Sequence, residues 1–135
     1  MRYAEFFEKA ERVWERDPAE AERLIREAEA HSLASVPIHL NHCAWFWRNR
    51  LHSRDNALRC LLLNECRTAP DDQAALLEIT EAYLTIARDI DSAERCFKKA
   101  LAATSTDPER VKAFLAKYGR KSENGDTFCL ESRDL

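Results

Sequence analysis

Apolar side chains recur along the start of the chain at a spacing typical of an amphipathic helix. They fall at intervals of three and four residues, which places them on one face of a helix. The stripe consists of Tyr3, Phe6, Phe7, Ala10, Val13 and Trp14. It predicts a helix over about residues 2–15.

A similar pattern of side chains then appears three times at a constant interval of 36 residues. Each copy begins with alanine, has a large apolar residue four positions later, and has a mostly small residue seven positions after the alanine. The copies begin at Ala21, Ala57 and Ala93, and the later positions hold Ala28, Asn64 and Ala100. A fixed period of this length predicts stacked helical repeats. Small residues at such positions allow neighbouring helices to approach closely.

Capping signals divide the chain into helices. Asp17 followed by Pro18 predicts one helix start, and Thr106-Asp107-Pro108 predicts the last, which Gly119 ends. The second unit opens after Ser35-Val36-Pro37, and Pro70 marks its end. The predicted helices cover about 2–15, 18 onward, 38–51, 56–67, 71–88, 92–104 and 108–118.

We therefore expect an all-α fold with no sheet. Three helix-turn-helix units of period 36 would form a right-handed solenoid over residues 1–119, with the last helix as its cap. Residues 120–135 are polar and predict a flexible tail, in which Phe128-Cys129-Leu130 can dock locally.

The composition narrows the class of partner. The 135 residues include only 2 glycines and 4 prolines, and the net charge is −3, without the basic excess of a nucleic-acid binder. The sequence has no apolar run long enough to predict a secretory signal or a membrane-spanning helix. The 5 cysteines form no C-x-x-C pair and are odd in number, so they predict reduced and mostly buried thiols, with Cys129 the most exposed. We expect a cytoplasmic protein without a nucleic-acid or membrane partner.

The repeated units resemble the tetratricopeptide repeat (TPR) family, whose units follow W-x2-L-G-x2-Y, A-x3-F, a small residue and Pro. The third unit is the most similar, with Leu76-x2-Ile79-Thr80-x2-Tyr83, then Ala93-x3-Phe97, then Ala100. The second offers Leu40-x2-Cys43-Ala44-x2-Trp47, then Ala57-x3-Leu61 and Pro70. The period is 36 where the family has 34, the third unit has one extra residue in its turn, and Ala44 and Thr80 replace the usual glycine.

The resemblance implies that the first helix of each unit lines a concave groove that binds a peptide or helix of another protein. Helical geometry then selects the side chains that point into this groove. They are Arg12, Asn41, Trp45, Arg48, Asn49, Leu77, Glu81 and Leu84. In the run Trp45-Phe46-Trp47, either all three rings are core, or Trp45 is a partly exposed anchor that acts with Arg48.

The sequence gives weaker indications of a carboxylate-binding site, a metal site or a catalytic site. Asn41 and Arg48 are compatible with clamping a peptide carboxylate, but Glu81 opposes it. His39-x-x-His42 beside Cys43 has nearly the spacing of metal ligands, yet no third ligand is evident, so we expect no metal and no cofactor. No catalytic motif is recognisable. We expect a non-catalytic adaptor or scaffold. The alternatives are a self-associating or chaperone-like module, which would form a homo-oligomer through Trp45 or through Phe6 and Phe7, and then an RNA-binding helical repeat.

Overall fold

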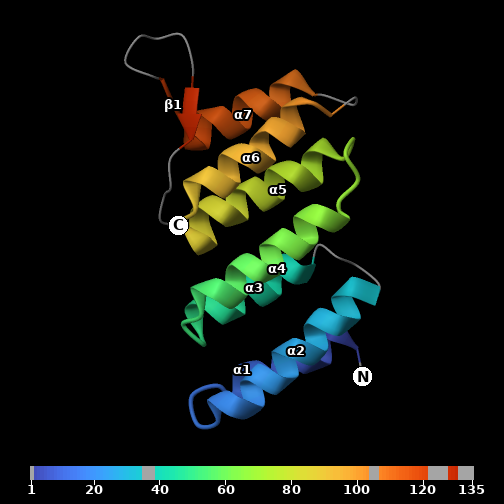
Figure 1. Ribbon diagram of the computed structural model, residues 1–135. Helices are drawn as coiled ribbons and strands as arrows, with labels where there is room; N and C mark the ends of the chain where they lie inside the picture. Colours follow the sequence, from blue (N-terminus) through green and yellow to red (C-terminus); the bar gives the residue numbers. More distant parts are fainter. Residues whose placement is uncertain (1, 35–38, 104–106, 122–127, 131–135) are drawn as a thin grey trace. The chain divides into compact units, whose positions relative to one another are not determined.

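The computed structural model describes residues 2–34, 39–103, 107–121 and 128–130 (Figure 1). The predicted opening of the second unit at residues 35–38 and Thr106 of the last cap lie outside these ranges. The chain divides into two compact units, Met1–Arg67 and Thr68–Leu135. The described residues are helical apart from turns and one short pair of strands. The predicted all-α class is thus confirmed, whereas the expectation that the chain contains no sheet is wrong. No helix in these ranges has the length and apolar character needed to cross a lipid bilayer.

The first unit consists of two helix pairs. They are α1 (Tyr3–Val13) with α2 (Pro18–Ala34), and α3 (Leu40–Asn49) with α4 (Arg54–Arg67), and α2 also contacts α3 (Figure 1). The predicted cap at Asp17 is present, because its carboxylate accepts a hydrogen bond of 3.2 Å from the backbone N–H of Glu20. This bond satisfies one of the free N–H groups at the start of α2.

The second unit contains α5 (Gln73–Ala82), a π-helical turn η2 (Tyr83–Ala87), α6 (Ile90–Leu101) and α7 (Pro108–Tyr118). Asp72, Asp89 and Asp107 cap the three α-helices through their side-chain oxygens, and of these caps only the one at Asp107 was predicted. Because Asp89 is the cap, α6 begins at Ile90, two residues before the predicted start. The helix predicted over residues 71–88 is thus an α-helix that widens in its last five residues. The wider turn accommodates an additional residue within the helix.

The turns that follow α3 and η2 have the same geometry. His52 and Arg88 have φ values of 53° and 54°, in the left-handed region that non-glycine residues rarely adopt. In each turn the next residue donates a backbone hydrogen bond back to a buried aromatic residue, from Ser53 to Trp47 O at 2.8 Å and from Asp89 to Tyr83 O at 2.9 Å. The matching positions of the two turns lie 36 residues apart.

The echoed positions form the interior of both units. The leading alanines Ala21, Ala57 and Ala93 are fully buried, as are Ala28, Asn64 and Ala100. Buried polar groups at these contacts have partners: the Asn64 amide donates to Asn41 Oδ1 at 2.9 Å, and the Thr80 hydroxyl donates to Leu76 O at 2.7 Å. The close packing of these helices therefore does not leave the buried side chains of Asn64 and Thr80 without a hydrogen-bond partner.

A short antiparallel strand pair ends the second unit. β1 (Gly119–Lys121) directly follows α7 and pairs with β2 (Phe128–Leu130), with Gly119 opposite Leu130. β2 contacts α6 and α7, and Leu130 is buried. The strand β2 lies within residues 120–135, which were predicted to form a polar tail. The burial of Leu130 agrees with the expectation that Phe128-Cys129-Leu130 can dock locally.

Candidate functional site

Five of the residues predicted to line the groove belong to the first unit. Arg12 on α1 and Asn49 on α3 are exposed, while Asn41 and Arg48 on α3 are half-buried. The Asn49 amide donates to the backbone oxygen of Trp45 at 3.0 Å. Arg48 Nε is buried and has no hydrogen-bond partner in the part of the chain that the structure describes.

The three consecutive aromatic residues of α3 have different environments. Phe46 and Trp47 are buried, whereas Trp45 is 37% exposed. Trp47 donates from its indole nitrogen to Glu29 at 3.1 Å, and the Phe46 ring lies 5.5 Å from that of Phe7. Trp45 is thus partly exposed, so the interpretation in which all three rings are core is wrong, while the role of Trp45 as an anchor for a partner stays a prediction.

The arginine that contacts Trp45 is Arg50. Its guanidinium carbon lies 5.0 Å from the ring centroid of Trp45 and 5.1 Å from that of Trp14. Its Nε also donates to a Glu11 carboxylate oxygen at 3.3 Å. From the sequence, Trp45 was expected to act with Arg48, so the contact with Arg50 was not predicted. One feature of the sequence could have indicated the contact between Trp14 and Arg50. The two residues directly follow α1 and α3, and they are separated by 36 residues, which is the interval of the repeat.

The two histidines considered as metal ligands belong to an aromatic cluster. His39 stacks on Tyr3 with 4.3 Å between ring centroids and on His42 with 5.9 Å. Burial, and then the charge of His42, lower the pKa of His39. Within residues 2–34, 39–103, 107–121 and 128–130, no three His, Cys, Asp or Glu side chains gather as a set that could hold a metal ion.

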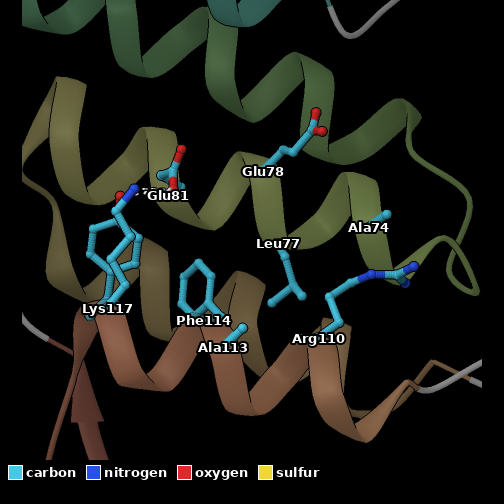
Figure 2. A pocket seen from close by; sticks show the side chains of 9 residues that line it. Ala74, Leu77, Glu78, Glu81, Arg110, Ala113, Phe114 and Lys117 are labelled. Carbon is cyan, nitrogen blue, oxygen red and sulfur yellow. Dashed lines mark hydrogen bonds and ion pairs between the residues drawn. The ribbon is translucent and has the colours of Figure 1, made fainter.

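The second unit has a pocket of about 330 Å³ between α5 and α7 (Figure 2). Its lining combines apolar and charged side chains: Ala74, Leu77, Glu78, Glu81, Arg110, Ala113, Phe114, Lys117 and Tyr118. Leu77 and Glu81, both predicted to line a groove, therefore lie together here. Leu84, the third residue predicted from this helix, is fully buried and is not among the lining residues.

One end of this pocket is closed by a polar cluster. The Tyr118 hydroxyl donates to Glu81 Oε2 at 2.7 Å, and Lys117 Nζ lies 3.5 Å from the same oxygen. Burial, and then the bond to Glu81, raise the pKa of Tyr118. The contact with the Tyr118 hydroxyl, and then the charge of Glu81, raise the pKa of Lys117. Both groups therefore keep their protons at neutral pH, and the Glu81 charge is matched by the ammonium group of Lys117.

At the opposite end, Gln73 directly precedes the lining residue Ala74 and connects the start of α5 to α7. Its side-chain oxygen accepts bonds from the backbone N–H of Asp107 at 2.9 Å and from Arg110 at 3.4 Å. Arg110 also lies 4.0 Å from the Asp107 carboxylate. None of the α7 residues of this pocket was predicted as a binding residue, because the last helix was expected to serve only as the cap of the stack.

No protein-family model, curated protein or solved structure matches this chain.

Proposed function

We propose that this protein is a non-catalytic adaptor or scaffold that binds a peptide or helix of another protein. The pocket between α5 and α7 is the observation that carries the proposal. Leu77 and Phe114 form an apolar floor, and charged side chains stand at its rim. A concave apolar surface with a few polar groups that fix orientation is typical of a binding site.

Two features support a repeat architecture that resembles the TPR family. The echoed alanines are buried at equivalent places, and the turns at His52 and Arg88 match at the same interval. In such a stack the first helices of successive units line the concave face, and α5 would be one of these helices. We further propose a cytoplasmic location, without cofactor, nucleic acid or membrane.

Trp45 offers a second contact point, on the first unit. Tryptophan is enriched at interface positions whose truncation weakens binding strongly. Because the guanidinium group of Arg50 lies over the Trp45 ring in the free protein, part of the side-chain freedom of Trp45 is already lost before a partner covers the ring.

The test is a selection of peptides from a random 12-residue phage library on the full chain, followed by titration of labelled copies of the selected peptides. Ala113→Trp fills the pocket and should reduce binding at least tenfold. Ala30→Trp makes the same change at an exposed position of α2, outside both hollows of the second unit, and should leave binding unchanged. Binding that is indifferent to Ala113→Trp contradicts the proposal, provided that circular dichroism shows equal helicity.

Self-association is a second candidate, and one observation favours it. A hollow of about 400 Å³ lies on α7 and has a mostly apolar lining of Pro108, Val111, Lys112, Leu115 and Ala116. Such a face can bury apolar area against a second copy. Sedimentation from low to high concentration would detect this association, and Ala116→Glu should abolish it. A chain that stays monomeric throughout this range would exclude the second candidate.

A further inference from the structure

We infer that the α5–α7 pocket takes a large apolar side chain from a partner segment that also carries a lysine or arginine, and that Glu78 receives this positive charge. The inference rests on the proposed function and adds the chemistry of the partner. It follows from the shape of the pocket and from the way its own charges are matched.

The pocket has room for an apolar side chain because two of its positions are small. Ala74 on α5 and Ala113 on α7 leave space that longer side chains would fill. Figure 2 shows Leu77 reaching from α5 toward α7 and Phe114 reaching from α7 toward α5. The Phe114 ring is held by Phe97 and Tyr118, at 5.4 Å and 5.0 Å between centroids. The floor is thus formed before a partner arrives, which lowers the entropic cost of binding.

The two walls of the pocket have opposite charge. The α5 wall carries Glu78 and Glu81, and the α7 wall carries Arg110 and Lys117. Glu81 is matched by Lys117 and by the hydroxyl of Tyr118. Arg110 bonds to Gln73 and lies near the carboxylate of Asp107, so its charge is also compensated.

Glu78 is the fourth charged side chain of the pocket lining. It is exposed on the α5 side of the pocket, and no hydrogen bond or ion pair joins it to any residue that the structure describes. Figure 2 shows Leu77 pointing from α5 toward α7 and Glu78 pointing from α5 away from α7. A partner segment that covers the apolar floor and crosses α5 therefore brings a neighbouring side chain to this carboxylate. A lysine or arginine there would gain a charge-assisted contact.

An acidic partner would meet the opposite situation. It would face the negative charge of Glu78, and it would have to compete with Glu81 for Lys117 and with Asp107 for Arg110. Unfavourable contacts of this kind discriminate between partners as effectively as favourable ones. The charge arrangement therefore selects a basic partner segment over an acidic one.

The experiment applies the same random 12-residue library to the wild-type chain and to Glu78→Lys. Peptides selected on the wild type should combine a large apolar residue with lysine or arginine, and should bind Glu78→Lys about tenfold more weakly. Selection on Glu78→Lys should enrich acidic residues instead. Glu94→Lys, on α6, makes the same change in net charge outside the pocket lining and should not alter the selected peptides.

The outcomes separate this inference from the proposed function. Peptides that Ala113→Trp or Ala74→Trp displaces, but that show no preference for basic residues, overturn the inference and leave the peptide-binding function in place. If no peptide is enriched, or if neither tryptophan variant weakens binding, the proposed function fails and the inference fails with it.

Discussion

The guanidinium carbon of Arg50 lies 5.0 Å from the ring centroid of Trp45, and the ring of Trp14 lies at a similar distance from it. Two tryptophans thus hold one arginine at the ends of α1 and α3, and Glu11 pairs with its charge. Each of these cation–π contacts contributes about 0.5–1 kcal/mol, so Arg50 stabilises the packing of α1 against α3, two helices that are distant in sequence.

Removing Arg50 tests the strength of this tie. Arg50→Ala should lower the free energy of unfolding by about 1–2 kcal/mol, since both ring contacts and a partly exposed ion pair are lost. Urea denaturation would measure the change. Arg12→Ala, at an exposed position of α1, serves as the control and should cost under about 0.5 kcal/mol. Equal losses in the two variants would show that the aromatic contacts add nothing.

The stability of the first unit should depend on the protonation of His39. Burial and the neighbouring His42 lower the pKa of His39 below its ordinary value of 6.5. The unfolded chain therefore binds this proton more readily than the folded protein, and stability falls as the pH drops from about 7 through 6.5 to the lowered pKa. Urea midpoints across this range should show a smaller decrease for His39→Phe, which keeps a ring against Tyr3. An unchanged pH profile in His39→Phe would mean that another group titrates.

The turn after α3 carries conformational strain at His52. A left-handed φ of 53° costs a side-chain-bearing residue about 1–2 kcal/mol, and glycine avoids this cost. After the loss of backbone entropy is subtracted, His52→Gly should stabilise the protein by about 0.5–1 kcal/mol. His52→Ala keeps the unfavourable φ and should not stabilise. Thermal unfolding of the two variants in parallel would distinguish strain relief from simple removal of the imidazole.

Gly119 joins α7 to β1 where there is no space for a side chain. A Cβ atom added there would stand 2.7 Å from the backbone oxygen of Leu115, which cannot move without disturbing the helix. Gly119→Ala should therefore destabilise the second unit by about 1–3 kcal/mol, as measured by urea denaturation. An unaltered midpoint would mean that the end of α7 relaxes freely.

The buried alanine that begins the third echo should not tolerate enlargement. Ala93 is fully buried on α6, so Ala93→Leu forces neighbouring side chains apart and should cost about 1–3 kcal/mol. Ala30→Leu places the same atoms on an exposed position of α2 and should be nearly neutral. If both variants unfold at the same urea concentration, the packing around Ala93 is looser than its burial indicates.

Features set by neighbouring residues were predictable from the sequence. The caps at Asp17 and Asp107 depend on a side chain and an N–H group within three residues, and the structure has them at those places. The buried alanines were also identifiable, because helical spacing places them on one face.

Features that join distant residues were not predictable in the same way. The contact of Arg50 with Trp14 depends on how two helix ends meet, and the pocket depends on how α7 lies against α5. The π-turn η2 left a trace, since the third unit has one extra residue, but the sequence did not indicate that this residue would be absorbed inside the helix.

The bonds at Gln73 and Glu81 tie α7 to α5 at the two ends of the pocket. Eight residues separate these two anchors along α5, which corresponds to about 12 Å of helix. This length accommodates about two turns of a docked helix, or about four residues of an extended chain. The recognition that we propose for this pocket would therefore be limited to a short sequence motif, and a longer partner would have to make its remaining contacts elsewhere on the protein.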